Sequence, residues 1–196
     1  MTIQRWFPLG DDAVLVEFRD PADRWQVRCP PALETVVGAT TVLLRFDPGR
    51  HSPSAVVDAL TLVPVTDTGT REHVIDVVYD GPDLGVVADR SGLTVTEVIR
   101  RHSEQPYLCE FCGFAPGFAY LSGIDQALIG PRRDTPRPQV PAGSVGIAGP
   151  FTAIYPMASP GGWFLLGTTT SPLFQPDRDP PALIAPGDRV RFRALS

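Results

Sequence analysis

Four segments rich in Gly, Pro and aromatic residues lie between residues 113 and 163, and they hold most of the side chains that could bind a small molecule. Glycine permits close approaches that other residues cannot make, and proline fixes φ and lowers loop entropy. Aromatic rings between them would form rigid walls, so the pattern predicts a preorganised pocket for a small molecule or a peptide. A barrel that needs many tight turns is the alternative. The segments are Gly113–Leu121, Pro131–Arg137, Val140–Gly149 and Tyr155–Trp163.

The second of these segments carries the one basic cluster, formed by Arg132, Arg133 and Arg137. An arginine on a proline-stiffened loop could bind a carboxylate or a phosphate through two parallel hydrogen bonds. The alternative is a solvated loop. His102 lies just before the Gly- and Pro-rich region, at the end of an expected helix. Its imidazole could act as a general acid or base near neutral pH, or it could cap the helix dipole.

Cys109 and Cys112 have the C-x-x-C spacing of half a zinc site or of a redox pair. A structural zinc ion needs four ligands and no second pair follows, so we expect no metal site. The segment also has the pattern of a β-strand, in which residues three apart point to opposite faces. Two small, half-buried apolar side chains are therefore the favoured interpretation.

Composition excludes several other functions. The chain of 196 residues contains no Lys, so its 17 basic residues are all Arg, and neither a Schiff-base lysine nor a Walker-type phosphate loop is possible. No dinucleotide fingerprint, G-x-S-x-G elbow or H-E-x-x-H motif occurs. A net charge of −5 without a basic stripe argues against nucleic-acid binding. No membrane span or signal peptide is visible, so a cytoplasmic location is the default.

The N-terminal third should form a small layer of strands and helices. Strands are expected over residues 3–8, 13–18 and 40–46, which are rich in β-branched and apolar residues. A short helix is expected over Pro31–Val37. A second helix should begin at Pro53, behind the N-cap Ser52, and run to about Leu62. The polar segment Val65–Arg71 is interpreted as a linker.

The remainder of the chain should begin with a strand over Val74–Tyr79 and two helices. The first helix should cover residues 83–91, and the second should start at the capping box Thr94-x-x-Glu97 and end near His102. From Tyr107 onward short apolar segments alternate with Gly and Pro, which favours a barrel or a sandwich. In the last strand Val190 and Phe192 should point inward. The expected strands are Tyr107–Phe111, Phe118–Leu121, Ser144–Ala148, Thr152–Tyr155, Trp163–Gly167 and Arg189–Arg193.

Several motifs, in order, resemble the family of the 5-oxoprolinase B subunit, also called allophanate hydrolase subunit 1, which includes the kinase inhibitor KipI. The ordered match covers about residues 72–193, and Leu9-Gly10-Asp11-x-Ala13 and Phe46-Asp47-Pro48 have counterparts as well. The other matching motifs are His102, Gly113-Phe114-x-Pro116-Gly117-Phe118-x-Tyr120-Leu121, Pro131-Arg132, Pro136-Arg137, Val140-Pro141-Ala142-Gly143-Ser144-Val145, Ile154-Tyr155-Pro156, Ser159-Pro160-Gly161-Gly162-Trp163 and Pro186-Gly187-Asp188-Arg189-Val190.

The resemblance implies an α+β protein, with a small N-terminal α/β sandwich domain over residues 1–70 and a cyclophilin-like β-barrel over residues 71–196. It implies a hydrolase subunit that cannot act alone. With a C subunit (allophanate hydrolase subunit 2-like) and a third subunit of the lactam-utilisation type, the assembly would open the cyclic amide of 5-oxoproline using ATP. This chain itself would bind no cofactor. A KipI-like regulator that inhibits a histidine kinase is the alternative, and prolyl isomerisation by the barrel is a third.

The implied site is a pocket at a heteromeric interface, with His102 and Tyr155 as candidate catalytic residues and Arg137 as the expected anion binder. Phe151, Phe164 and Thr168 stand where the family usually has Gln, Gln and Arg. These departures remove hydrogen-bonding groups, so they bear on the substrate rather than on the fold. The expected substrate-binding residues are Arg132, Arg137, Phe118, Ser144, Ser159, Gly161, Gly162 and Trp163.

Overall fold

The computed structural model describes residues 3–63 and 71–195 and shows two compact units, Met1–Gly69 and Thr70–Ser196. Strands are the main regular structure of the described residues, which also form three α-helices. Each unit buries its own set of apolar side chains. The linker expected over residues 65–71 lies outside the described residues, apart from Arg71.

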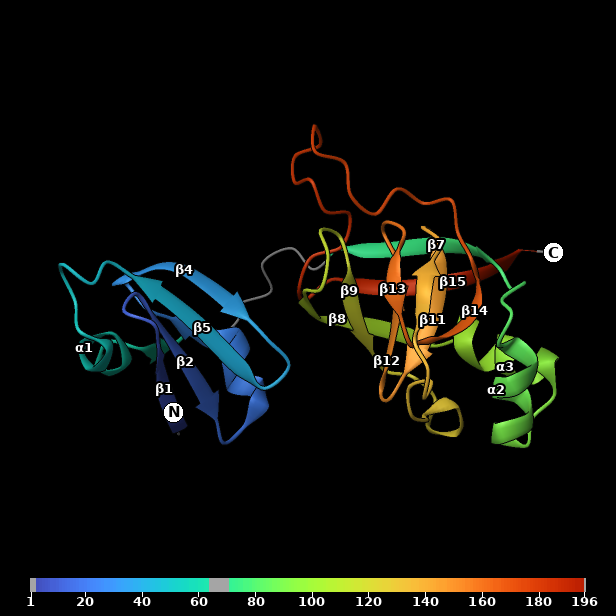
Figure 1. Ribbon diagram of the computed structural model, residues 1–196, viewed down its shortest axis with the longest axis horizontal. Coiled ribbons are helices and arrows are strands. Elements are labelled where there is room, and N and C mark those ends of the chain that lie inside the picture. The colour runs from blue at the N-terminus through green and yellow to red at the C-terminus, as the bar shows by residue number, and fades with distance from the viewer. Residues whose placement is uncertain (1–2, 64–70, 196) are drawn as a thin grey trace. The chain divides into compact units, whose positions relative to one another are not determined.

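A four-stranded antiparallel sheet with the order β1-β2-β5-β4 forms the first unit (Figure 1). Alternate apolar residues of the two central strands are buried, and helix α1 (Pro53–Asp58) packs on that side. The strands are β1 (Ile3–Leu9), β2 (Ala13–Phe18), β4 (Ala32–Val37) and β5 (Thr41–Phe46); β3 (Val27–Arg28) pairs with β6 (Thr61–Leu62), and a 3-10 helix covers Pro21–Gln26. The buried apolar residues of this core are Val14, Val16, Phe18, Val27, Val42, Leu44, Phe46, Val56, Val57 and Leu60.

The helix expected over Pro31–Val37 is wrong, because residues 32–37 form strand β4. Val36 and Val37 are β-branched and pair with Leu43 and Val42 of β5, so pairing with a neighbouring strand outweighs the weak helical pattern. Helix α1 also ends earlier than expected, at Asp58, and the last two expected residues join β6.

Seven strands close into a barrel in the second unit, in the order β11-β12-β9-β8-β15-β7-β14 (Figure 1). Neighbours are antiparallel except β15 and β7, which run parallel from the pair Arg189–Glu72 to the pair Leu195–Val78. Val190 and Phe192 are buried, which confirms the predicted inward face of the last strand. The strands are β7 (Glu72–Val78), β8 (Pro106–Cys112), β9 (Ala119–Ser122), β11 (Ser144–Ala148), β12 (Phe151–Ile154), β14 (Phe164–Thr168) and β15 (Arg189–Leu195), and β10 (Arg137–Val140) pairs separately with β13 (Ser159–Gly161).

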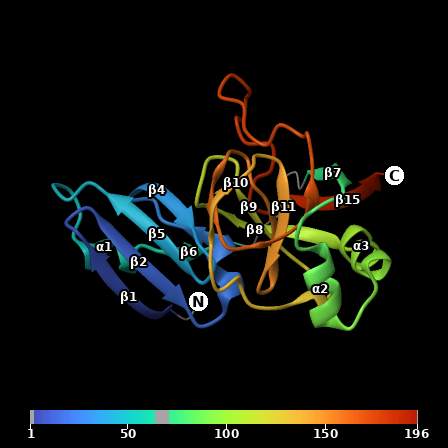
Figure 2. The same cartoon turned by 45° about the vertical axis from the view of Figure 1, so that its right-hand side comes forward.

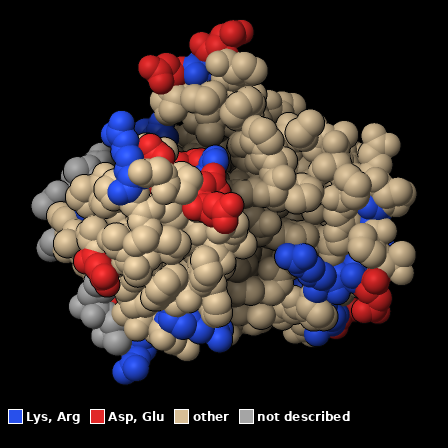
Figure 3. Space-filling view, turned by 60° about the vertical axis from the view of Figure 1, so that its left-hand side comes forward, with Lys and Arg blue, Asp and Glu red and all other residues tan. Residues whose placement is uncertain are grey.

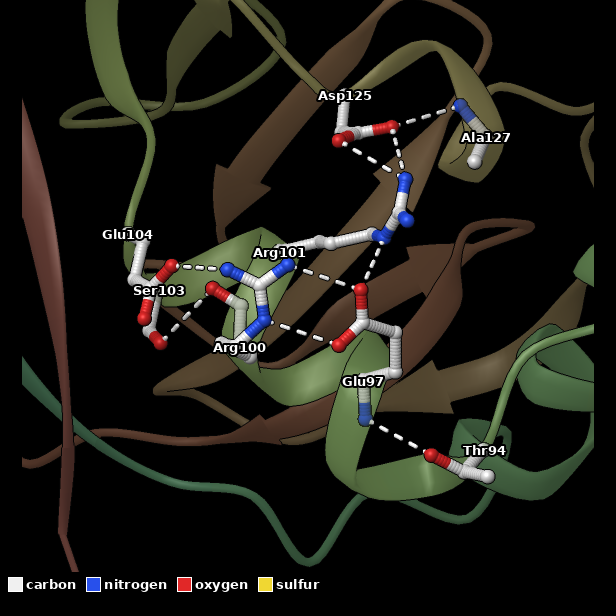
Figure 4. Close-up of polar contacts among 8 residues, drawn as sticks. All are labelled: Thr94, Glu97, Arg100, Arg101, Ser103, Glu104, Asp125 and Ala127. Carbon is white, nitrogen blue, oxygen red and sulfur yellow. Dashed lines mark hydrogen bonds and ion pairs between the residues drawn. The ribbon is translucent and has the colours of Figure 1, made fainter.

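Helices α2 (Leu84–Ser91) and α3 (Val95–Ser103) lie together beside the barrel (Figures 1 and 2). Helix α2 ends at Gly92, whose φ of +65° suits glycine, and the Thr94 hydroxyl caps α3 by accepting a bond from the Glu97 amide at 3.2 Å. The Glu97 carboxylate accepts bonds from Arg100 and Arg101 (Figure 4). No helix within the described ranges is long and apolar enough to cross a membrane.

Charged side chains of both signs lie in small separate groups on the face shown in Figure 3. On the barrel, charged side chains of neighbouring strands form pairs, as in Arg191 with Glu72 at 3.0 Å and Arg193 with Asp76. Exposed pairs of this kind contribute little to stability, so the barrel depends on its apolar interior.

Strand β8 carries an irregularity that changes the expected arrangement of its cysteines. The pairing with β9 shifts register between Cys109 and Phe111. A β-bulge of this kind turns the following side chains, so the two Sγ atoms of Cys109 and Cys112 lie 3.8 Å apart. The expectation that these residues point to opposite faces is therefore wrong.

Candidate functional site

An aromatic pocket with a cavity of about 90 Å³ lies on the second unit, and loops from four parts of the sequence converge on it. Residues 113–118 connect β8 to β9, and residues 131–136 precede β10. Backbone contacts hold these loops together: the Arg133 amide donates to the Gly162 carbonyl at 2.8 Å. The residues that line the aromatic pocket are Phe114, Phe118, Tyr120, Arg132, Tyr155, Pro160, Gly161, Gly162 and Trp163.

Rings packed edge to face form the rigid part of the aromatic pocket. The Phe118 centroid lies 5.3 Å from that of Tyr155 and 5.6 Å from that of Trp163, with both pairs near perpendicular. All three side chains are buried. Gly161 allows this packing, since a Cβ there would lie 2.3 Å from the Tyr155 hydroxyl oxygen. Burial raises the pKa of Tyr155, so its hydroxyl stays protonated at neutral pH and can donate a hydrogen bond.

Phe114 is held in an unusual backbone conformation at the edge of the aromatic pocket. Its φ is +70°, in the left-handed region that costs a non-glycine residue about 1–2 kcal/mol, and its side chain is 61% exposed. The ring still makes edge contacts with Phe118 and Tyr155. At Gly117, a Cβ would meet the Phe174 Cβ at 2.8 Å, so this loop fits tightly against its neighbour. A strained, exposed aromatic residue beside a pocket is typical of a binding site.

The three arginines of the basic cluster have different partners. Arg133 and Arg137 both bind the buried carboxylate of Asp83, at 2.9 Å and 2.7 Å, and the same carboxylate accepts the Leu165 amide at 2.7 Å. Both guanidinium groups are therefore engaged with Asp83. Arg132 is exposed, lines the aromatic pocket, and has no ion pair with any residue that the structure describes. Arg137, which the sequence also suggested as an anion binder, is the one that pairs with Asp83.

His102 lies in the barrel interior and does not line the aromatic pocket. It is fully buried, and its ring stacks on Phe192 with centroids 4.7 Å apart. The Thr152 hydroxyl donates to the Gly146 carbonyl, so it accepts from Nε2 of His102 at 2.9 Å. Nδ1 is then the acceptor for the Tyr79 hydroxyl at 2.7 Å. Burial lowers the pKa of His102 to about 3, so the ring is neutral at pH 7.

Two expected serines are also not among the residues that line the aromatic pocket. Ser144 is buried and lines a second cavity of about 270 Å³, together with Asp80 and Thr168. Ser159 belongs to β13, and its hydroxyl donates to the Met157 carbonyl at 3.5 Å. Six expected site residues thus come together around the pocket: Tyr155, Arg132, Phe118, Gly161, Gly162 and Trp163.

The sequence interpretation missed Phe114, Tyr120 and Pro160 as lining residues, and Asp83 as the partner of two arginines. Phe114, Tyr120 and Pro160 belong to the Gly-, Pro- and aromatic-rich segments Gly113–Leu121 and Tyr155–Trp163, so the sequence offered a signal for them. Asp83 had no comparable signal, because its partners are 50 and 54 residues away in the sequence. Among the described residues, no group of three or more His, Cys, Asp or Glu is placed to hold a metal ion.

The family model of the carboxyltransferase domain, subdomain C and D, matches residues 4–184. Three curated proteins that carry the name of the 5-oxoprolinase B subunit are similar to the chain. The Escherichia coli O157:H7 protein is 40% identical over 96% of this chain and 94% of its own length. The Bacillus subtilis protein is 47% identical over 59% of this chain and 48% of its own. The chain belongs to the family of the 5-oxoprolinase B subunit.

Three solved structures are similar in fold to the chain. TTHA0988 is 35% identical with a TM-score of 0.80, and the match covers 98% of this chain and 40% of that one. PH0987 from Pyrococcus horikoshii is 34% identical with a TM-score of 0.62, over 98% of both chains. The Kluyveromyces lactis urea carboxylase shares the fold at 18% identity, with a TM-score of 0.75 over 97% of this chain and 22% of that one. The chain therefore corresponds to well under half of two of these proteins.

Proposed function

We propose that this chain is the B-type subunit of an assembly that opens 5-oxoproline to glutamate with ATP, and that the aromatic pocket holds the substrate. One observation carries the proposal: the exposed guanidinium of Arg132 lies beside a wall of aromatic rings and a protonated tyrosine. The names of the family members supply the substrate, a five-membered lactam ring with one carboxylate. Each part of that molecule has a chemical counterpart in the pocket.

The ring of the lactam would lie against Phe118 and Trp163, whose faces and edges are fixed by packing. The carboxylate would pair with Arg132, which can form two parallel hydrogen bonds to it. The Tyr155 hydroxyl would donate to the lactam carbonyl, where negative charge grows when the C–N bond is attacked. This use of Tyr155 keeps the role expected for it, whereas His102 is proposed to be structural.

The size of the aromatic pocket supports a site that a second chain completes. Complete pockets for small molecules usually have volumes of about 300–1,000 Å³. A cavity of about 90 Å³ is much smaller. We therefore propose that the C subunit covers the aromatic pocket. The ATP-dependent step would then use groups of the C subunit and of the third, lactam-utilisation subunit, since this chain has no Lys for a Walker-type loop.

The test is ATP-dependent turnover of 5-oxoproline by the chain co-expressed with both partner subunits. Replacing Arg132 with Ala removes a charge-assisted bond of about 1.5–3 kcal/mol, so KM should rise about 10- to 100-fold while kcat changes little. Arg191→Ala is the matched control, because Arg191 is an exposed arginine paired with Glu72 on β7. Equal KM values for the two variants would contradict the anion-binding role of Arg132. A complete assembly without turnover would contradict the proposed reaction on the lactam.

A further inference from the structure

The end of strand β8 places two thiols side by side in a part of the barrel that the proposed lactam chemistry does not use. The Sγ atoms of Cys109 and Cys112 are 3.8 Å apart, and a bulge in the strand creates this approach. Cys109 is fully buried, whereas Cys112 is partly exposed. Cys29, the third cysteine, belongs to the other unit, where its thiol donates to the Val56 carbonyl at 3.4 Å.

The environment gives the two thiols different reactivities. A hydrogen bond from Cys109 lowers the pKa of Cys112, and the same bond together with burial raises the pKa of Cys109. The thiolate is the reactive form of cysteine, so we expect Cys112, a partly exposed residue with a lowered pKa, to react first. Cys109 is buried behind it, within reach of its sulfur. This is the arrangement of an attacking thiol and a resolving thiol.

We propose that Cys109 and Cys112 form a reversible dithiol–disulfide site that exchanges with low-molecular-weight disulfides. The Cys112 thiolate attacks one sulfur of the disulfide RSSR, a mixed disulfide forms, and one thiolate RS⁻ leaves. Cys109 then loses its proton and attacks the Cys112 sulfur, which expels the second RS⁻. Both leaving groups are protonated by the two protons that the cysteines release. The two protein thiols are oxidised to one disulfide, and RSSR is reduced to two RSH.

The folded wild-type chain, treated with oxidised glutathione, alkylated and digested with trypsin, tests the proposal. Cleavage after Arg101 and Arg132 gives one peptide that contains Cys109 and Cys112, whereas Cys29 falls in another. We expect the first peptide to lose two hydrogen atoms and both alkylation sites, with reversal by dithiothreitol, while Cys29 stays alkylated. A chain with all three thiols still alkylated, a stable glutathione adduct at Cys112, or a disulfide between two chains would overturn the proposal.

Two variants separate the roles of the thiols. In Cys109→Ala the resolving thiol is missing, so one glutathione should remain attached to Cys112. In Cys112→Ala the buried Cys109 should stay a free thiol under the same treatment. Cys29→Ala is the matched control and should form the disulfide as the wild type does. If Cys109 reacts in the absence of Cys112, the order of attack proposed here is wrong.

Discussion

Arg132 lies in the loop before β10 and Arg137 is the first residue of that strand, and of these two only Arg137 pairs with the carboxylate of Asp83. Arg137 lies 2.7 Å from this buried group and shares it with Arg133, whereas Arg132 faces the aromatic pocket. A buried carboxylate that loses a partner keeps its desolvation penalty, so an arginine in this position stabilises the fold. An exposed arginine outside such a pair can serve binding.

The two arginines should therefore differ in their effect on stability. We expect Arg137→Ala to lower the free energy of unfolding by about 1.5–3 kcal/mol, because a charge-assisted bond to a buried group is lost. Arg132→Ala should stay within about 0.5 kcal/mol of the wild type, as exposed substitutions usually do. Urea unfolding of both variants measures the difference. Equal losses would show that Arg132 has a structural partner after all.

His102 predicts a specific dependence of stability on pH. The unfolded imidazole binds a proton below about pH 6.5. Burial lowers the folded pKa to about 3, so between these values the unfolded state holds more protons. Stability is therefore complete above pH 6.5 and falls as the pH drops toward 3, by up to about 1.4 kcal/mol per pH unit.

Urea unfolding between pH 7 and pH 4 checks this expectation, with His102→Gln as the comparison because Gln does not titrate. The wild type should lose stability faster than the variant over this range. NMR titration of the His102 ring in the wild type gives a second measurement that does not depend on how the variant folds. A ring that titrates near pH 6.5 would contradict the proposed burial.

At the scale of elements, the connection into α2 shows how closely the helix is fitted to the barrel. A Cβ on Gly81 would lie 2.3 Å from the Leu165 carbonyl oxygen, because the chain passes directly over β14 there. Gly85, in the first turn of α2, has open space in the direction of a Cβ. Glycine is therefore required at position 81, where two chain segments approach closely, whereas at position 85 it only lowers the stability of the helix.

Alanine at the two positions should have opposite effects. We expect Gly85→Ala to raise the free energy of unfolding by about 0.5–1 kcal/mol, because alanine favours the helix. Gly81→Ala should lower it by about 1–3 kcal/mol, as overpacking usually does. Thermal and urea unfolding of both variants would measure the changes. A stabilised Gly81→Ala would mean that the loop before α2 moves away from β14 easily.

Sequence patterns predicted correctly those helices and strands whose structure depends on their own residues rather than on distant partners. Val190 and Phe192 alternate with arginines, and Thr94 precedes a helical face, so β15 and the start of α3 followed directly. Long-range partners decide the rest. Residues 32–37 become a strand through pairing with β5, and the bulge after Cys109 arises from its register with β9. Similarly, motif spacing located the aromatic pocket, but it could not show that His102 packs inside the barrel.

At the scale of the whole molecule, the buried residues of each unit cluster only with one another, which implies that the two units can lose structure separately. Val14, Val16 and Leu44 belong to the core of the first unit, and Val145 and Ile147 to the core of the second. A cavity in one core removes contacts only from the side chains around it.

Leu44→Ala tests this separation. We expect a loss of about 2–5 kcal/mol in the first unit, since Leu44 is fully buried there. Hydrogen exchange followed by mass spectrometry should show weaker protection of β2 and β5 with unchanged protection of β7, β8 and β15. An equal loss of protection in both units would show instead that they unfold as one cooperative body.

The parallel pair of β7 and β15 also governs the order of events when the chain folds. These are the first and the last strands of the barrel in the sequence. The contact between Glu72 and Arg191 joins residues 119 positions apart. Pairing over such a separation carries a large loop-closure entropy and slows folding. During synthesis on the ribosome, the edges of β7 and β8 that pair with β15 stay unpaired until residues 189–195 emerge. Exposed edges recruit other strands, so recovery of folded protein from denaturant should fall as chain concentration rises.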